Sequence, residues 1–113
     1  MNRPADNPPA PADLTTTIRR DHEGAVLFVS GEIDASTAPR LRSHLDDFGR
    51  DDIGKVVVDL ADVTFLDAAG IAVLLNTDAR LRSLGARLTV RSPRTAAARV
   101  LRAAGAAELL ACD

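Results

Sequence analysis

Short apolar runs alternate with polar turns along the chain, in an order that predicts two strands and then a helix, a strand, a helix, a strand and a helix. Residues 15–18 and 25–29 are rich in strand-forming types and flank the polar segment 21–24, which ends in glycine. That pattern is typical of a β-hairpin. Residues 56–58 are three consecutive valines, a run that predicts a strand buried on both faces. Residues 87–91 make the fourth predicted strand.

The first predicted helix follows a polar turn that contains Ser36 and Thr37. Their hydroxyls are placed to cap the helix, and Pro39 is tolerated in its first turn. The apolar residues that recur at helical spacing predict one buried stripe: Ala38, Leu41, Leu45 and Phe48. A helix between the hairpin and the next strand implies a crossover connection, and therefore a mixed sheet with a parallel core.

The second predicted helix follows Asp67 and ends near Leu84, because Gly85 stands where a helix commonly ends in a left-handed residue. The apolar residues on one side of this helix are Ile71, Leu74, Leu75 and Leu81. Asp78 falls on the same side as these residues. We expect the end of the helix to leave the core there, so that Asp78 pairs with Arg82 four residues later.

The third predicted helix has Ser92 as its N-cap and Pro93 as its first residue, and it runs to about residue 104 before Gly105. Residues 108–111 are predicted to add a last helical turn. The chain is therefore expected to form an α/β fold, with one mixed sheet of about four to five strands and about three to four helices packed on it.

Length and composition limit the number of domains. A chain of 113 residues is long enough for one core and too short for two. Residues 1–13 contain four prolines among small and polar residues, a composition that predicts a disordered tail. Residues 14–113 are predicted to be the single domain.

Charge and residue types exclude several kinds of function. The formal net charge of −2 and the scattered arginines argue against a nucleic-acid binder. With one cysteine, Cys112, neither a disulfide framework nor a thiolate metal site is expected, and no cofactor is predicted. The longest apolar stretch, residues 68–75, is far below the ~20 residues that cross a bilayer. Residues 1–13 lack the apolar core of a signal peptide, so we expect a cytoplasmic protein.

One turn dominates the candidate chemistry. Asp67, Ala68, Ala69 and Gly70 join a predicted strand to a helix, where unpaired backbone N–H groups usually make a regulatory or catalytic site. The two alanines supply no reactive group. Asp34 and Asp67 could suggest a catalytic pair of carboxylates, but no nucleophile, metal-ligand set or phosphate loop accompanies them in the sequence. We therefore expect a binding protein rather than an enzyme, with both acids facing a partner.

These segments resemble the STAS domain family, which includes the bacterial anti-sigma factor antagonists and the cytoplasmic domains of sulfate transporters. Four features occur in the family's order and spacing from residue 14 onward. They are Gly-Glu-Ile-Asp at 31–34 before a helix, Val-Asp-Leu at 58–60 leading to Val-Thr-Phe-Leu-Asp at 63–67, the helix opening at 70–75, and Ser-Pro at 92–93.

The resemblance implies a module that controls a sigma factor indirectly. Antagonists of this family bind an anti-sigma factor of the serine/threonine kinase type and so release the sigma factor. The kinase can phosphorylate the residue directly after the aspartate of the turn, and this breaks the complex. In this chain that residue is Ala68, which cannot be phosphorylated. The resemblance places partner-binding residues in the loops 35–39 and 64–69 and at the start of the next helix: Asp34, Ser36, Thr37, Thr64, Leu66, Asp67, Ala68, Ala69 and Gly70.

Several alternatives stay open at this point. The alanine is consistent with a natural antagonist that is always competent to bind, with a STAS domain that has another partner, or with an engineered variant. Ser36, Thr37 and Thr64 carry hydroxyls near the turn, but capping or packing explains them more simply than phosphorylation. The alternative function is a scaffold subunit of a stress-signalling or lipid-transport assembly. Either protein is expected to be a monomer or a homodimer.

Overall fold

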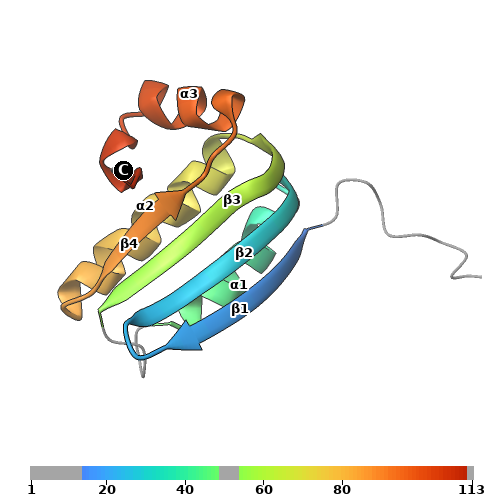
Figure 1. The fold of residues 1–113 in the computed structure, drawn as a ribbon. Coiled ribbons are helices and arrows are strands. Elements are labelled where there is room, and N and C mark those ends of the chain that lie inside the picture. The colour runs from blue at the N-terminus through green and yellow to red at the C-terminus, as the bar shows by residue number, and fades with distance from the viewer. Residues whose placement is uncertain (1–13, 49–53, 112–113) are drawn as a thin grey trace, which may run out of the picture.

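The computed structural model describes residues 14–48 and 54–111, and the tail predicted at residues 1–13 lies outside them. The elements alternate much as the sequence predicts (Figure 1). In chain order they are β1 (Thr15–Asp21), β2 (Gly24–Ile33), α1 (Ala38–Asp46), β3 (Lys55–Leu66), α2 (Ala68–Ser83), β4 (Arg87–Arg91), α3 (Thr95–Ala103) and the short 3₁₀ helix η1 (Ala107–Leu109).

The four strands form one sheet in the order β1-β2-β3-β4. β1 and β2 are an antiparallel hairpin, whereas β3 is parallel to both β2 and β4. The predicted mixed sheet with a parallel core is therefore confirmed. The chain passes from β2 through α1 to the parallel strand β3, and from β3 through α2 to the parallel strand β4.

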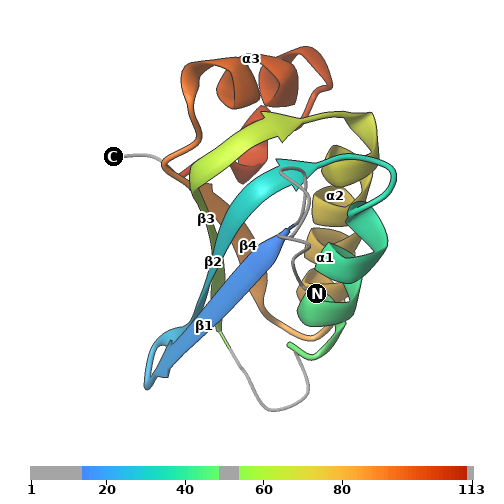
Figure 2. The ribbon, with the colours of Figure 1, turned by 90° about the vertical axis from the view of Figure 1, so that its right-hand side faces the viewer.

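Among the described residues, helices cover one face of this sheet and leave the other uncovered (Figure 2). Figure 2 shows α1 and α2 together on one side, with α3 across the end of the sheet and no helix on the other side. Val56 and Val58 point toward the helices and are buried, whereas Val57 between them is half-buried on the uncovered side. The expectation that residues 56–58 are buried on both faces is therefore wrong, because a run of valines does not reveal which layers cover it.

β2 and β3 are longer than the apolar runs suggest. β2 continues through Gly31 and Glu32 to Ile33, and β3 continues through Thr64 to Leu66. The expected loop at residues 64–69 is therefore wrong: residues 64–66 belong to β3 and residues 68–69 to α2, and Asp67 alone separates the two elements. Register shifts in the β2–β3 ladder near Ser30 and Glu32 interrupt the alternation of apolar and polar residues. The apolar runs in the sequence therefore end before the strands do.

The second helix ends as predicted but stays in the core. Gly85 has φ +84°, and the N–H of Ala86 donates to the carbonyl of Leu81 (2.8 Å), the bond that closes a left-handed helix end. Asp78 pairs with Arg82 (3.0 Å) as expected. The expectation that this end leaves the core is wrong, because Asp78 is buried and accepts a hydrogen bond of 2.9 Å from the N–H of Leu88 in β4.

The third helix begins later than predicted. Ser92 adopts φ +57° and belongs to a turn, so Ser92 and Pro93 are not the N-cap and first residue of α3. Arg94 takes the N-cap position without a capping side chain, and its Nε donates instead to the carbonyl of Ala61 (3.0 Å). That bond ties the start of α3 to β3. No helix in residues 14–48 and 54–111 is long and apolar enough to cross a membrane.

Candidate functional site

Two aspartate-led turns lie side by side where β2 and β3 end. The strands are parallel, and Ile33 is the register partner of Leu66, so the residues that follow them emerge at the same edge. The N–H of Asp67 donates to the carbonyl of Ile33 (3.2 Å). Residues 34–37 and 67–70, called the two-turn edge below, therefore adjoin each other although residues 38–66 separate them in the sequence. Figure 2 shows both strands leading into α1 and α2 at this edge.

Asp34 organises the first turn. Its Oδ1 accepts hydrogen bonds from the hydroxyl of Ser36 (2.7 Å), the N–H of Ser36 (2.9 Å) and the N–H of Thr37 (3.1 Å). The Ser36 hydroxyl is the main cause that lowers the pKa of the Asp34 carboxyl from its ordinary value of 3.8. The carboxylate is therefore charged at neutral pH and held in one orientation at the surface.

The predicted capping of α1 by hydroxyls is wrong. Thr37 stands at the N-cap position but makes no side-chain cap bond. Its hydroxyl instead donates to the carbonyl of Glu32 (2.7 Å) and accepts from the N–H of Asp34 (2.9 Å). The hydroxyl of Ser36 is bonded to Asp34. The Thr37 hydroxyl thus closes the turn onto the end of β2, and the Ser36 hydroxyl stabilises the turn itself, while the carbonyl of Asp34 accepts the N–H of Ala38 (2.8 Å).

Asp67 begins the second turn and caps α2. Its side chain accepts a bond of 2.9 Å from the N–H of Ala69, the usual role of an N-cap aspartate. Ala68, at the first position of the helix, is exposed, and Ala69 is half-buried. A Cβ at Gly70 would lie 2.4 Å from Cγ2 of Ile33 and 2.7 Å from Cδ1 of Leu66. Only glycine lets α2 start this close to the ends of β2 and β3.

A shallow apolar groove of about 360 Å³ continues from the two-turn edge along α1 and α2. Small side chains form most of its walls, and Arg42 and Asn76 supply its polar groups. The residues that line it are Ala35, Ala38, Pro39, Arg42, Ala69, Ala72, Val73 and Asn76. The groove could receive apolar side chains of another protein beside the two carboxylates.

The predicted partner-binding residues gather at this edge but differ in exposure. Thr37, Leu66 and Gly70 are buried, so they shape the edge and offer no side chain to a partner. The remaining six are exposed or half-buried: Asp34, Ser36, Thr64, Asp67, Ala68 and Ala69. Thr64 lies at the end of β3, and its hydroxyl donates weakly to the carbonyl of Gly31 (3.3 Å).

The residues predicted for partner binding leave out Phe65, which lies beside the two-turn edge. Phe65 is 48% exposed, between Thr64 and the buried Leu66 near the end of β3. Because neighbouring residues of a strand point to opposite faces, Phe65 turns outward where Leu66 turns into the core. It also borders a small hollow of about 170 Å³ between β3 and α3.

The arrangement offers a surface that another protein could bind. Within residues 14–48 and 54–111, no three His, Cys, Asp or Glu side chains form a group that could hold a metal ion. The two aspartates accept hydrogen bonds from backbone N–H groups of their own turns. Such an edge can offer oriented negative charge and an apolar groove to a protein surface.

The chain is similar to known proteins over most of its length. A family model described as Mlab, STAS domain, matches residues 16–111. The anti-sigma-F factor antagonist RsfB of Mycobacterium tuberculosis is 37% identical over 73 residues, which cover 64% of this chain and 59% of RsfB. The aligned part is therefore less than two thirds of the length of that relative.

Solved structures agree with this similarity. The crystal structure of an anti-sigma factor antagonist from Mycobacterium paratuberculosis is 31% identical, with a TM-score of 0.73 over 89% of this chain and 86% of that one. The anti-sigma factor antagonist SpoIIAA in its unphosphorylated form has a TM-score of 0.75 over 86% of each chain, at 14% identity. The likeness to SpoIIAA shows a common fold alone.

Proposed function

Because the chain belongs to the STAS domain family, we propose that it is a non-enzymatic regulator that binds an anti-sigma factor and so releases a sigma factor. The relatives named anti-sigma factor antagonists support this role. The observation that carries it is the two-turn edge. Asp34 and Asp67 are fixed there side by side at the ends of two parallel strands.

The partner contacts the exposed side chains of the two-turn edge. Asp34 presents a carboxylate that three hydrogen bonds hold in place, and a preorganised charge loses little freedom on binding. Ala68 is exposed at the centre of the edge. The groove between α1 and α2 receives apolar side chains of the partner, and Arg42 at its rim can pair with an acid.

The anti-sigma factor in this proposal is of the serine/threonine kinase type, but the chain lacks the residue that such a kinase would modify. A phosphate at position 68 would add roughly −1.5 to −2 charges beside Asp67. Ala68 cannot carry a phosphate, and neither can Ala69. Binding is therefore not switched off at this turn, and the chain acts as an antagonist that is always competent to bind.

A binding and release assay tests the proposal. A fluorescent sigma factor is bound to the kinase-type anti-sigma factor of the same cell, and the purified chain is added. We expect the chain to bind the anti-sigma factor and to displace the sigma factor in proportion to its concentration. Binding without displacement, or no binding, would contradict the antagonist role.

The second candidate is a scaffold subunit of a stress-signalling or lipid-transport assembly. The alanines at positions 68 and 69 favour it, because a permanent subunit needs no switch. A scaffold should co-purify from the source cell with a large assembly at fixed stoichiometry. A regulator should instead purify as a small monomer or dimer that binds a soluble kinase-like protein.

A further inference from the structure

The side of the sheet opposite α1 and α2 has an apolar centre that no described element covers. Figures 1 and 2 show this face bare from β1 to β4. Strand register places Val26 beside Val57 in the middle of it, with Phe28 two residues further along β2. Each of these three side chains is half-buried. Together with Arg19 and Arg91 they are called the open face below.

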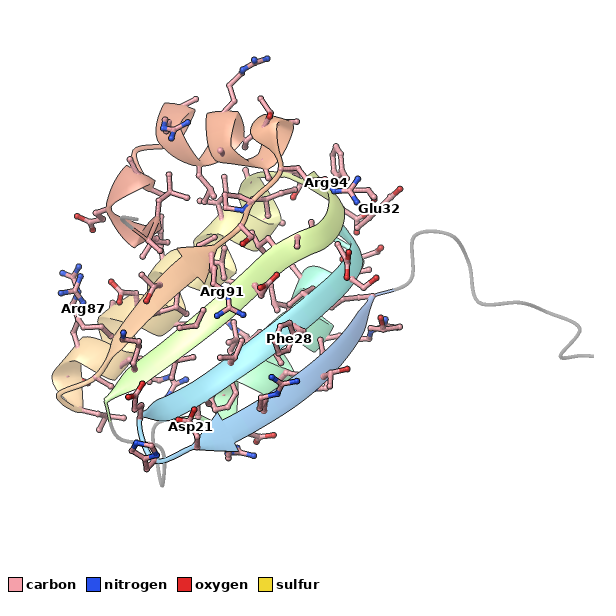
Figure 3. All side chains as sticks on the ribbon, viewed as in Figure 1. Asp21, Phe28, Glu32, Arg87, Arg91 and Arg94 are labelled. Atoms are coloured by element: carbon pink, nitrogen blue, oxygen red, sulfur yellow. The ribbon has the colours of Figure 1, made fainter. Side chains whose placement is uncertain are left out.

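Two guanidinium groups approach Phe28 from the two edge strands. The Cζ atoms of Arg19 in β1 and Arg91 in β4 each lie 5.6 Å from the centroid of its ring. Figure 3 shows Phe28 and Arg91 pointing out of the same face. A guanidinium resting on an aromatic ring is already oriented, and its planar fork suits the two oxygens of a carboxylate.

Positive and negative side chains are distributed unevenly over the open face. Asp59 offsets Arg91, since its Oδ2 lies 2.9 Å from Nε of that side chain. Two further acids lie away from the centre of this face, Asp21 at the hairpin end and Glu32 near the far end of β2 (Figure 3). The Oδ1 of Asp21 accepts the N–H groups of Glu23 and Gly24. The centre around Phe28 is therefore cationic, although the whole chain has a formal net charge of −2.

From these observations we propose that the open face binds an acidic amphipathic helix of a partner protein. Arg19 and Arg91 stand on β1 and β4, and their Cζ atoms are at most about 11 Å apart, because each lies 5.6 Å from the same ring centroid. A helix is about 10–12 Å wide with its side chains. A helix lying along β2 and β3 would seat apolar residues on Val26, Phe28 and Val57, and carboxylates on its two flanks would reach the two arginines.

Charge complementarity favours this occupant over a second copy of the chain. In a symmetric dimer through the open face, the cationic centre of one copy would meet the cationic centre of the other, because the same patch faces itself. Like charges facing each other across an interface are costly. The open face also lies on the opposite side of the sheet from the groove between α1 and α2, so its occupant need not compete with an anti-sigma factor.

The test uses a defined probe. The full chain labelled with ¹⁵N is titrated with a synthetic peptide of about 18 residues, about 27 Å long as a helix, with leucines on one face and glutamates on both flanks. A matched peptide has lysine in place of each glutamate. We expect the glutamate peptide to shift the amide signals of Val26, Phe28 and Val57, and to bind more weakly as salt is raised. The lysine peptide should leave them in place.

Variants locate the site. Arg19→Glu reverses a charge on the open face and should lower the affinity for the glutamate peptide by about tenfold or more. Arg99→Glu makes the same change on the exposed side of α3 and should change the affinity by less than about twofold. Thermal unfolding of each variant confirms that it is folded.

Other outcomes overturn the proposal. Equal binding of both peptides, shifts confined to α1 and α2, or no shifts at all would show that the open face does not select an acidic helix. Signals of the open face that change on dilution of the free chain would identify a second copy as the occupant. Signals of residues 1–13 that move in Arg19→Glu would identify the chain's own N-terminal segment.

Discussion

The backbone N–H of Asp67 donates a 3.2 Å hydrogen bond to the carbonyl oxygen of Ile33. This single bond joins the residue that follows β3 to the residue that ends β2, and it sets the spacing of the turns that follow both strands. Gly70 allows α2 to begin against the same Ile33 side chain. The geometry of the proposed docking site therefore depends on the backbone and on buried packing, and it does not need a hydroxyl at position 68.

Leu74→Ala should lower the free energy of unfolding by ~2–5 kcal/mol, because it removes a fully buried side chain and leaves a cavity. Leu74 has no exposed surface in α2. Leu84→Ala is the matched control, since Leu84 is 51% exposed at the end of the same helix and should change stability by no more than ~0.5 kcal/mol. Denaturant unfolding of both variants measures the difference, and equal effects would contradict the assigned helix face.

Asp78→Ala should cost about 1–3 kcal/mol of stability, because the buried N–H of Leu88 loses its acceptor. Asp78→Asn keeps an acceptor oxygen for that N–H and loses the charge that pairs with Arg82 and Arg87, so its effect should be smaller. Chemical unfolding compares the two variants. If both variants lower the free energy of unfolding equally, the hydrogen bond to β4 is not the main stabilising interaction of Asp78.

The pKa of the Asp34 carboxyl should rise toward its ordinary value of 3.8 in Ser36→Ala, because the Ser36 hydroxyl is the largest cause of its lowering. A carboxyl with a lowered folded pKa stabilises the fold above its unfolded pKa, and this contribution is lost as the pH falls through the folded pKa. The effect is therefore confined to acid solution below about pH 4. Carbon-detected NMR titration of Asp34 in both proteins measures the shift, and identical titration curves would contradict this origin.

The sequence predicted the sheet, three helices and the position of the candidate site, because these depend on local patterns of apolar residues and on the resemblance to a family. It did not predict contacts between distant residues. Nothing near Asp78 indicates that its carboxylate accepts the N–H of Leu88. The bond from Arg94 to Ala61 likewise joins two elements that are far apart in the sequence. It accompanies the start of α3 at Thr95, two residues after Pro93.

At the candidate site, the structure brings the predicted segments together but gives some of their residues other roles than expected. Ser36 and Thr37 are common capping types, yet the hydroxyl of Ser36 donates to the carboxylate of Asp34 and the hydroxyl of Thr37 donates to the carbonyl of Glu32 in β2. Leu66 was expected to face a partner and is buried, because β3 continues further than its run of valines. The exposed Phe65 follows from the same longer strand.

The wild-type chain should acquire no phosphate in the turn 67–70, since this turn contains no hydroxyl. Ala68→Ser restores one at an exposed position and should be phosphorylated by a kinase-type anti-sigma factor with ATP. Intact-mass and fragment mass spectrometry detect the modification. Stoichiometric phosphate on Ser36 or Thr64 of the wild-type chain would show that the switch lies elsewhere in the two-turn edge or beside it.

The most direct test of the central claim is the affinity of Ala68→Glu for the kinase-type anti-sigma factor, measured by calorimetry. A carboxylate desolvated at the centre of the two-turn edge without a partner should weaken binding by more than ~1.4 kcal/mol, a tenfold change. Ala79→Glu places the same group on the exposed side of α2 away from the edge and should bind like the wild type, as should Ala68→Ser before it is phosphorylated. Undiminished binding by Ala68→Glu would show that the two-turn edge is not the docking site.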